Sequence, residues 1–296
     1  MGTGRKACVG FATDGERGAF TPDDALGAAA LERRGVQVRP VVWSRPLDPE
    51  VEVVLLRSTW DYHLRLAEFL RWIDGLEGRG IPLWNRPDTV RRNVDKRYLE
   101  GLARRGVPVV PSREVHRGSQ WTLRAVLEES GWTEAVVKPA VSGGGWRTWR
   151  TRGEPDDEAR FAEQLAMADC LVQPFAPEIQ DPGEWSLIFF DGVFSHAAMK
   201  RPAPGDFRVQ EEFGGTKVRG APPPALISQA ERVLALAGER TLYARVDGVV
   251  RKGQLQLLEL ELVEPSLYLD VVPEAAERFA DAVVRWLDAE PPSARP

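Results

Sequence analysis

A strand that alternates leucine with glutamate is the part of this chain best suited to chemistry. Leu258, Leu260 and Leu262 alternate with Glu259 and Glu261, and side chains in a strand point to opposite faces with a period of two. Two carboxylates on one face of an apolar strand repel each other and are costly to desolvate. Their spacing lets both reach one hard divalent cation such as Mg²⁺. A solvated edge strand with its polar face outward explains the pattern equally well.

A third carboxylate, Asp247, lies on the preceding strand two residues after Arg245, and a short turn joins the two strands. With a two-residue turn, Asp247 would pair with Leu258, on the wrong face. With a three-residue loop, Asp247 would pair with Glu259 and Arg245 with Glu261. We predict the second register, because it gathers three carboxylates at one site. The alternative is a plain hairpin in which Arg245 forms a salt bridge with a glutamate.

A strand that ends in Lys138 is followed by a glycine-rich loop made of Ser142, Gly143, Gly144 and Gly145. The lysine supplies a point charge, and glycines let backbone N–H groups approach phosphate oxygens. The loop lacks the Gly-Lys-Ser/Thr end of a Walker A motif, so a simple flexible loop is the alternative. One helix later, the carbonyl of Gln173 and the N–H of Phe175 could bind an adenine edge, unless this segment is an ordinary linker.

Basic residues lie between the predicted adenine strand and the acidic strands. Lys200, Arg201 and Arg208 bracket a segment rich in proline and glycine. Cations there could stabilise charge that develops on a transferred phosphoryl group, although surface basic residues are usually only solvated. The three histidines are scattered in the sequence and form no metal pattern. We therefore expect the chemistry to depend on carboxylates, lysines and arginines.

The elements that must position these residues fall into three successive regions. Residues 1–88 alternate strand and helix signals, which predicts a parallel sheet covered by helices. Residues 89–175 run strand, helix, strand, glycine loop, helix, strand, which predicts an α+β unit. Residues 176–296 are richer in strand, include an Asp191-Gly192 hairpin turn and close on a helix. The fold class is thus mixed, α/β followed by α+β, and the proline-rich end at 291–296 is predicted to be disordered.

Composition limits the classes of partner. The 296 residues are 43% hydrophobic and 28% charged, which is typical of a globular protein with a sizeable core. A formal net charge of −5 argues against broad binding to nucleic acid or to anionic membranes. No apolar run reaches transmembrane length, and the start lacks a signal-peptide pattern. Two cysteines in apolar surroundings fit a reducing compartment, so we expect a cytoplasmic location.

In their order and spacing, these motifs resemble those of the ATP-grasp superfamily, most of all the glutathione-synthetase-like branch that includes the D-cycloserine ring-closing synthetase. The resemblance covers nearly the whole chain. It implies an ATP-grasp fold, in which an N-terminal Rossmann-like (pre-ATP-grasp) domain precedes two α+β subdomains that clamp ATP. The markers are Arg57-Ser-Thr-Trp-Asp-Tyr, Asn93-Val-Asp-Lys-Arg-Tyr-Leu, Val137-Lys-Pro, Ser142-Gly-Gly-Gly-Trp, Gln173-Pro-Phe, Gly183-Glu, Gly205-Asp-Phe-Arg-Val-Gln, Gly214-Gly, Arg245-Val-Asp and Glu259-Leu-Glu.

The resemblance also implies roles for single residues. Mg²⁺, or Mn²⁺ in its place, would be held by Asp247, Glu259 and Glu261, although the family's usual residue at the last position is asparagine. The nucleotide would be bound by Lys96 and Lys138 at the α- and β-phosphates, by the glycine loop, by the backbone of Gln173 and Phe175 at adenine and by Glu184 at the ribose. The catalytic group would be Lys200, Arg208 and Arg245, the first two at the γ-phosphate and the acyl intermediate.

Candidate substrate residues come from two other motifs. We predict that Arg57, Trp60 and Asp61 bind the substrate's carboxylate, ring and amine respectively, with core packing as the alternative for Trp60. The glycine pair Gly214 and Gly215 is predicted to lie in the same substrate site.

The activity that the resemblance implies is ATP-dependent joining of a carboxylate to an amine, through an acyl phosphate, on a small amino-acid-like substrate. Ring closure within one molecule and joining of two amino acids look alike in sequence. A small-molecule kinase and a nucleotide-binding module without turnover are the alternatives from other classes. A homodimer or a higher homo-oligomer is an expectation from the resemblance.

Overall fold

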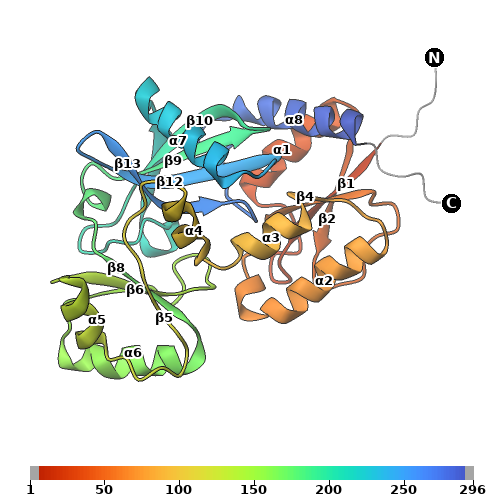
Figure 1. Ribbon diagram of the computed structural model, residues 1–296. Coiled ribbons are helices and arrows are strands. Elements are labelled where there is room, and N and C mark those ends of the chain that lie inside the picture. Colours follow the sequence, from red (N-terminus) through yellow and green to blue (C-terminus); the bar gives the residue numbers. More distant parts are fainter. Residues whose placement is uncertain (1–6, 291–296) are drawn as a thin grey trace, which may run out of the picture.

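Three β-sheets organise the computed structural model, which describes residues 7–290 (Figure 1). A parallel sheet has the order β2-β1-β3-β4, a central sheet has the order β5-β8-β6-β7, and a five-stranded sheet has the order β11-β10-β9-β12-β13. The predicted disordered end, 291–296, lies outside the described residues. Within the described residues, no helix is both long enough and apolar enough to cross a membrane.

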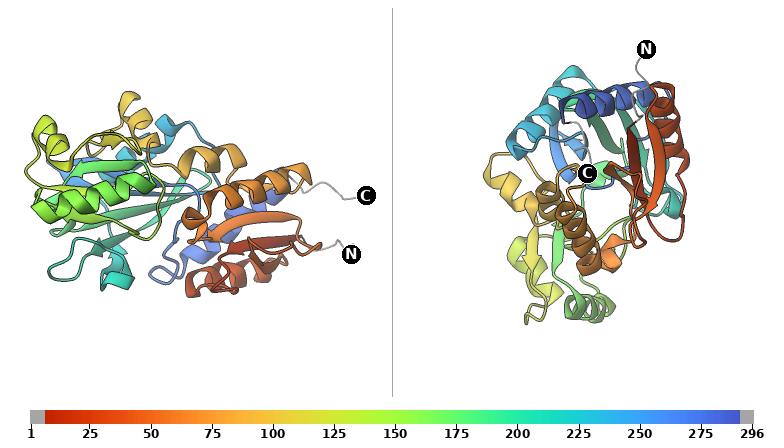
Figure 2. Two further views of the ribbon diagram at one scale, coloured as in Figure 1. Left: turned by 90° about the horizontal axis from the view of Figure 1, so that it is seen from below. Right: turned by 90° about the vertical axis from the view of Figure 1, so that its right-hand side faces the viewer.

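The N-terminal layer is a parallel α/β unit, as predicted. All its strand pairs are parallel. Its core shows that α1 and α8 cover one face of the sheet and α2 the other, an arrangement that can be followed in Figure 2. The elements are β1 (Cys8–Thr13), α1 (Pro22–Arg33), β2 (Gln37–Val42), β3 (Val53–Ser58), η1 (Tyr62–Leu64), α2 (Leu66–Gly78) and β4 (Leu83–Trp84).

The central sheet is antiparallel, and its helices α5 and α6 pack on one face through an apolar core of their own. Figure 1 shows both helices on the outer side of this lobe. The predicted α+β unit is confirmed, with one extra strand, β7, directly after the glycine loop. The elements are α3 (Pro87–Asn93), α4 (Tyr98–Arg104), β5 (Arg113–Val115), α5 (Leu123–Ser130), β6 (Ala135–Pro139), β7 (Trp149–Thr151), α6 (Pro155–Met167) and β8 (Cys170–Pro174).

The five-stranded sheet is also antiparallel. Its first hairpin turns at Asp191 and Gly192, whose φ angles of 51° and 75° suit a tight two-residue turn, so the predicted turn is confirmed. Strand β11 was not expected from the sequence. The elements are η2 (Pro177–Ile179), β9 (Glu184–Phe190), β10 (Val193–Arg201), η3 (Glu211–Phe213), β11 (Thr216–Gly220), α7 (Pro224–Ala237), β12 (Tyr243–Arg251), β13 (Gln254–Glu261) and α8 (Ala275–Ala289).

Helices pack across both predicted domain boundaries. Phe279 and Trp286 of α8 belong to one apolar cluster with α1 and β1, and Leu99 and Leu102 of α4 pack with α7 and the five-stranded sheet. Buried Asn85 donates to the carbonyl groups of residues 243 and 262, which ties the end of β4 to both acidic strands. Because helices pack across them, the boundaries drawn at 88 and 175 stay a prediction.

The register of the β12–β13 hairpin is the feature that builds the site. Asp247 pairs with Glu259, and Arg245 with Glu261, so the predicted pairing is confirmed. The predicted three-residue loop is wrong: Lys252 and Gly253 form a two-residue turn, with φ angles of 52° and 77°.

A bulge supplies the missing register shift. Gly248 pairs with Leu257, whereas Asp247 pairs with Glu259, so Leu258 is the extra residue on β13. A side chain at Gly248 would bring its Cβ to 2.6 Å from the carbonyl oxygen of Gln256, so the close strand approach beside the bulge requires glycine. The bulge, and not the turn, places the carboxylates on one face.

Candidate active site

A cleft of about 620 Å³ lies between the central sheet and the five-stranded sheet, and it reaches the loops that follow β1 and β3. Arg17 and Trp60 line it from those loops, in keeping with ligand binding beyond the carboxyl ends of parallel strands. The predicted site residues that line the cleft are Trp60, Lys96, Lys138, Ser142, Gly143, Gly144, Gly145, Gln173, Glu184, Lys200, Arg208, Arg245, Asp247, Glu259 and Glu261.

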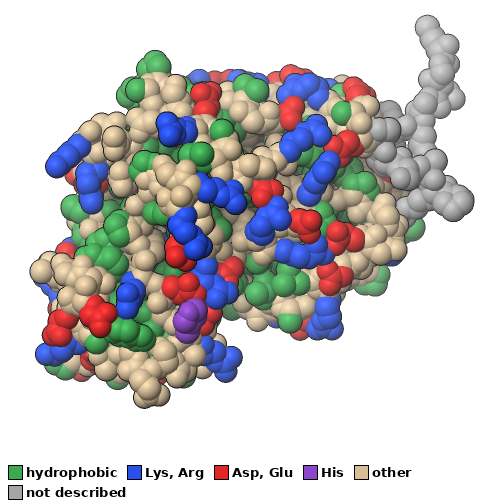
Figure 3. Space-filling model, in the orientation of Figure 1, with side chains coloured by type: hydrophobic (Ala, Val, Ile, Leu, Met, Phe, Trp, Pro, Cys, Tyr) green, Lys and Arg blue, Asp and Glu red, His purple; other side chains and the backbone are tan. Residues whose placement is uncertain are grey.

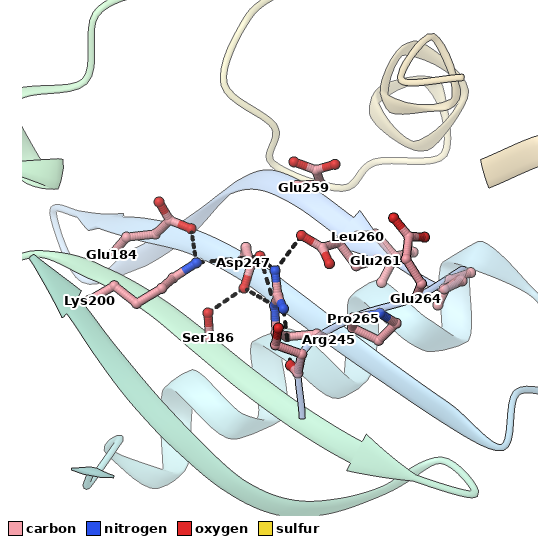
Figure 4. Close-up of polar contacts among 12 residues, drawn as sticks. Glu184, Ser186, Lys200, Arg245, Asp247, Glu259, Leu260, Glu261, Glu264 and Pro265 are labelled. Atoms are coloured by element: carbon pink, nitrogen blue, oxygen red, sulfur yellow. Dashed lines mark hydrogen bonds and ion pairs between the residues drawn. The ribbon is translucent and has the colours of Figure 1, made fainter. Parts of the chain in front are cut away.

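Arg245 is the centre of the acidic face of the cleft (Figure 4). Its Nε lies 3.0 Å and its Nη2 2.9 Å from Oδ2 of Asp247, Nη2 also pairs with Glu261, and Nη1 donates to the carbonyl of Ser266 at 3.0 Å. Arg245 is buried, so its charge is compensated by these partners and not by water. A guanidinium held in this way is a fixed positive group at the floor of the cleft.

Lys200 continues this network toward the central sheet. Its Nζ lies 2.6 Å from Glu184 and 3.6 Å from Asp247, and all three side chains are buried. Arg208, in contrast, lies on the loop between β10 and β11, where it pairs with Asp206 at 2.7 Å and stacks on Phe213. The predicted catalytic cations therefore line one cleft at different depths.

Two lysines face the carboxylates from the opposite side. Lys96 donates to the carbonyl of Ser142 at 2.6 Å and pairs with Glu259 at 3.0 Å. Lys138 lies on β6. Burial lowers the pKa of Lys138 to about 8; Lys96 adds to this shift, and Glu259 and Glu184 oppose it. A buried lysine with a lowered pKa gains most when an anion, such as a phosphate, comes beside it.

The glycine loop lies against both neighbouring layers. At Gly143 an added Cβ would come 3.3 Å from the His63 ring, and at Gly145 it would come 3.3 Å from Gln210. Gly144 and Gly145 have φ angles of 57° and 73°, which strongly favour glycine. The loop thus needs small residues both for its backbone conformation and for its close packing over the cleft.

The acidic face fits a bound divalent cation. Glu259 and Glu261 lie on one face with 28% and 26% of their side-chain surfaces exposed to the cleft. Burial raises the pKa of Glu261 to about 7, Arg245 opposes this shift, and Asp247 and Glu259 add to it. A cation between these carboxylates would relieve their repulsion. Both oxygens of Asp247 already accept hydrogen bonds from Arg245 or Ser186, so Asp247 could join a metal only by releasing one of them.

A second acidic group lies outside the cleft. Among the described residues, Glu114, His116 and Asp169 are the set whose ligand atoms lie within 4.8 Å of one another. Arg97 sits between them, with Nη1 3.2 Å from Glu114 and 3.1 Å from Asp169. The arginine already neutralises this group, which is partly exposed, so we interpret it as a surface ion-pair network.

One of the two backbone groups predicted to contact adenine is already used within the protein. The N–H of Phe175 donates at 3.0 Å to the carbonyl of Glu134, the residue just before β6, so it is not free for a ligand. Because hydrogen-bonded and non-bonded pairs alternate along an antiparallel ladder, Pro174 and Ala176 direct their backbone groups away from β6. Both line the cleft, whereas Phe175 stacks under Arg150. Gln173 lines the cleft through its side chain, which donates to Ser112.

Arg57, the predicted carboxylate ligand, has a structural position instead. It is 2% exposed, pairs with Asp24 at 3.0 Å, donates to the carbonyl of Pro265 at 3.0 Å and lies over the Tyr243 ring. Arg57 is not one of the described residues that line the cleft. Its charge is fully used in joining α1, β3 and the segment after β13.

We expect Arg57→Met to lower the free energy of unfolding by about 3–5 kcal/mol, because it leaves the buried Asp24 carboxylate without its partner. Urea denaturation followed by circular dichroism measures this change. The fraction that remains folded should still turn over the substrate, because Arg57 does not line the cleft. A stable variant with a sharply raised Michaelis constant would restore Arg57 as a substrate ligand.

The other predicted substrate residues divide in a similar way. Asp61 accepts from Trp43 Nε1 at 2.6 Å and pairs with Arg65 at 2.8 Å, outside the cleft lining of the described residues. Gly214 and Gly215 shape the loop: a Cβ at Gly215 would come 2.2 Å from the carbonyl oxygen of Val209. Of the substrate candidates, Trp60 alone lines the cleft within the described structure.

One cleft residue that the sequence analysis did not single out is Glu264. It lies just beyond β13, lines the cleft, and its backbone carbonyl accepts from Trp60 Nε1 at 3.2 Å. Arg17, stacked 4.5 Å from the centre of the Trp60 ring, was also missed. The signal for Glu264 was its place three residues after Glu261 and directly before Pro265.

These observations define the class of protein. Two antiparallel sheets close on a cleft, with buried lysines and a glycine loop on one side and carboxylates and Arg245 on the other, behind a parallel-sheet layer. That is the architecture of an ATP-grasp ligase.

Comparison with known proteins gives the family. Residues 9–85 match the family described as D-cycloserine synthetase DcsG, N-terminal domain. The chain is 35% identical over 267 residues to the cycloserine biosynthesis protein DcsG of Streptomyces lavendulae, covering 83% of this chain and 85% of that protein. It therefore belongs to the DcsG family of ATP-grasp ligases.

Solved structures agree with this assignment. The crystal structure of D-cycloserine synthetase DcsG is similar with a TM-score of 0.84 and 29% identity, over 95% of this chain and 100% of that one. D-alanine–D-alanine ligase from Bacillus anthracis, complexed with ATP, shares the fold with a TM-score of 0.68 at 17% identity, over 94% and 96% of the two chains. The predicted superfamily, fold class and carboxylate–amine ligase activity are confirmed, and the enzyme uses ATP.

Proposed function

We propose that this ligase activates the carboxylate of a small amino acid and closes the same molecule into a ring, as the name of D-cycloserine synthetase implies for its relative. The observation that carries this proposal is that one cleft is lined by Lys96, Lys138 and Arg245 together with the two partly exposed glutamates of β13. The 35% identity to DcsG over most of both chains supports ring closure over joining of two amino acids.

The nucleotide would lie along the cleft between the two antiparallel sheets. We place the adenine edge against the carbonyl of Pro174 and the N–H of Ala176, which replace Gln173 and Phe175 in that role. Lys96, Lys138 and the glycine loop would hold the phosphates. Contact between Glu184 and the ribose stays a prediction. The Glu184 carboxylate would then interact with both the ribose and Lys200.

Glu259 and Glu261 would hold Mg²⁺, or Mn²⁺ in its place, with Asp247 behind them. When bound, the ion supplies positive charge that neutralises the phosphates as the γ-phosphoryl group is transferred. The remaining catalysis is positioning and charge stabilisation by the chain itself.

The first step is attack of a substrate carboxylate oxygen on the γ-phosphorus, which releases ADP and leaves an acyl phosphate. Arg245, with Lys200 and Arg208, would stabilise the charge on the phosphoryl oxygens. In the second step a nitrogen of the same substrate attacks the acyl carbon, the acyl–oxygen bond breaks, phosphate leaves, and the nitrogen loses a proton. The glycine loop, packed against His63 and Gln210, would keep water from hydrolysing the acyl phosphate.

A screen of ADP release with mass analysis of the products tests this function. The compounds are β-aminooxy-D-alanine, which is the product of opening the ring amide of D-cycloserine, together with single amino acids and dipeptides. We expect ADP and free phosphate in equal amounts and a product that has lost one water relative to the substrate. A phosphorylated product would establish a kinase instead, and ADP release at background with every compound would contradict a catalytic role.

We expect the affinity for ATP to fall above pH 8 because of Lys138. The pKa of this lysine is about 8, so it is charged below that pH and neutral above it, and the phosphates need the charged form. The association constant should be flat below pH 8 and fall by up to about tenfold per pH unit above it. Titration calorimetry with ATP between pH 7 and 9.5 measures the slope.

Lys138→Arg is the matched control, because an arginine stays charged throughout this range. Its pH dependence includes every other titrating group of the cleft, so the difference between the two proteins isolates Lys138. Identical slopes in both would show that Lys138 does not contact the phosphates.

The compartment and the assembly are also proposals. Cys8 and Cys170 are buried and unpaired, which supports a reducing cytosol with its supply of ATP. On the face seen in Figure 3, basic and acidic side chains are interspersed, with no extended basic stripe. The net charge of −5 supports our proposal that the ligands are small molecules and not nucleic acid, and the homodimer stays a prediction.

A further inference from the structure

The Glu264 carboxylate lines the cleft without a partner. No hydrogen bond or ion pair joins it to another side chain of the described residues, whereas Glu259 pairs with Lys96 and Glu261 with Arg245. Figure 4 shows it next to Glu261, with no dashed line reaching it. It lies on the side of the cleft that Trp60 and Arg17 line, at the end of β13 away from the hairpin turn.

The backbone around Glu264 is held by side chains from three layers. Trp60 donates to the carbonyl of Glu264, Arg57 to that of Pro265 and Arg245 to that of Ser266. Asp23 of α1 accepts the N–H of Leu267 at 2.8 Å. Such a rigidly positioned carboxylate with no protein partner is suited to an external cation.

The electrostatic setting supports the same conclusion. Burial raises the pKa of Glu264 to about 8, with Glu261 and Glu259 adding to the shift and Lys96 opposing it. A positive group beside Glu264 would lower this pKa and so favour the charged carboxylate. The two groups would form a charge-assisted hydrogen bond in a poorly solvated place.

We propose that Glu264 binds the α-ammonium group of the substrate and so selects amino acids over simple carboxylic acids. This inference rests on the proposed function and deepens it. It takes the amine-binding role that the sequence had suggested for Asp61, whose carboxylate is used by Trp43 and Arg65. An ammonium donates three hydrogen bonds, and the unpartnered oxygens of Glu264 can accept from it.

The test compares each amino acid with its deamino counterpart. The pairs are β-aminooxy-D-alanine with β-aminooxypropionate, and D-alanine with propionate, and the readout is kcat/KM for ADP release. In the wild type we expect the amino compound to be favoured. In Glu264→Gln, the amino compound should lose about 10- to 150-fold, the range for a hydrogen bond to a charged group, while the deamino compound and the KM for ATP stay unchanged.

Asp61→Asn is the matched control, a carboxylate-to-amide change on the residue that competes for this role. We expect it to keep the wild-type preference for the amino compound. Loss of that preference in Asp61→Asn but not in Glu264→Gln would overturn the proposal, as would an equal loss for both compounds in Glu264→Gln.

The remaining outcomes are also decisive. If Glu264→Gln raises the KM for ATP or the Mg²⁺ concentration needed for half-maximal rate, Glu264 belongs to the metal site and the proposal is wrong. If the wild type releases no ADP with any compound, the proposed function itself fails. If it discriminates and the variant discriminates equally, this inference alone fails.

Discussion

Glu259→Gln should lower the rate of ADP release by at least about 10³-fold, which corresponds to about 4 kcal/mol of transition-state stabilisation. Glu259 is one of two exposed carboxylates that face Lys96 and Lys138 across the cleft. An amide is neutral, so the variant would hold Mg²⁺ more weakly and leave the charge on the transferring phosphoryl group poorly compensated. The rate is measured with a coupled ADP assay at saturating ATP, Mg²⁺ and substrate.

A carboxylate-to-amide change elsewhere separates this effect from a general loss of charge. Glu114→Gln alters the acidic group on the central sheet that Arg97 already neutralises, and we expect wild-type turnover. The melting temperature of Glu259→Gln should stay close to that of the wild type, because its side chain is partly exposed. Near-normal turnover in Glu259→Gln would mean that the ion, if used, binds elsewhere.

Arg245→Met should be damaging in two ways. Removing the guanidinium leaves the buried Asp247 and the partly exposed Glu261 without their shared partner, so the free energy of unfolding should fall by about 3–5 kcal/mol. In the folded fraction, kcat should fall by about 10²- to 10³-fold, as for the loss of one group that stabilises developing charge. Urea denaturation and steady-state kinetics measure the two effects separately.

Two further variants locate the cause. Arg245→Lys keeps the charge but loses the fork that reaches Asp247, Glu261 and the Ser266 carbonyl together, so it should retain more stability than activity. Arg251→Met removes an exposed arginine from the same strand, where it pairs with Glu178, and should cost less than about 1 kcal/mol. An active and stable Arg245→Met variant would contradict the role of Arg245 in the site.

The acidic strands illustrate what the sequence could predict. Leucine and glutamate alternate with a period of two, which is the period of a strand, so the sequence alone predicted that Glu259 and Glu261 share a face. Pairing with Asp247 was predicted correctly from the wrong loop, because a bulge leaves no clear mark in one sequence. The constraint on Gly248, whose Cβ would meet the neighbouring strand, becomes visible only in three dimensions.

The errors in the candidate site have one physical origin. Arg57 lies near the carboxyl end of β3 and Asp61 just after it, but within the described residues neither lines the cleft, because partners inside the protein hold both side chains. Asp24, which pairs with Arg57, and Trp43, which donates a hydrogen bond to Asp61, come from other elements, and Arg65 pairs with Asp61 from the start of α2. The proposed shift of the adenine contacts from Gln173 and Phe175 to Pro174 and Ala176 likewise follows from the ladder register, which the neighbouring strand decides.

The central claim, that the carboxylates of β13 hold the ion that acts on the nucleotide, is tested most directly by a crystal structure with Mn²⁺ and a non-hydrolysable ATP analogue. Anomalous difference density locates the ion independently of any refined coordinates. The account predicts a peak in the cleft within about 2.5 Å of carboxylate oxygens of Glu259 and Glu261, facing Lys138. A peak at Glu114, His116 and Asp169 with none in the cleft would contradict it.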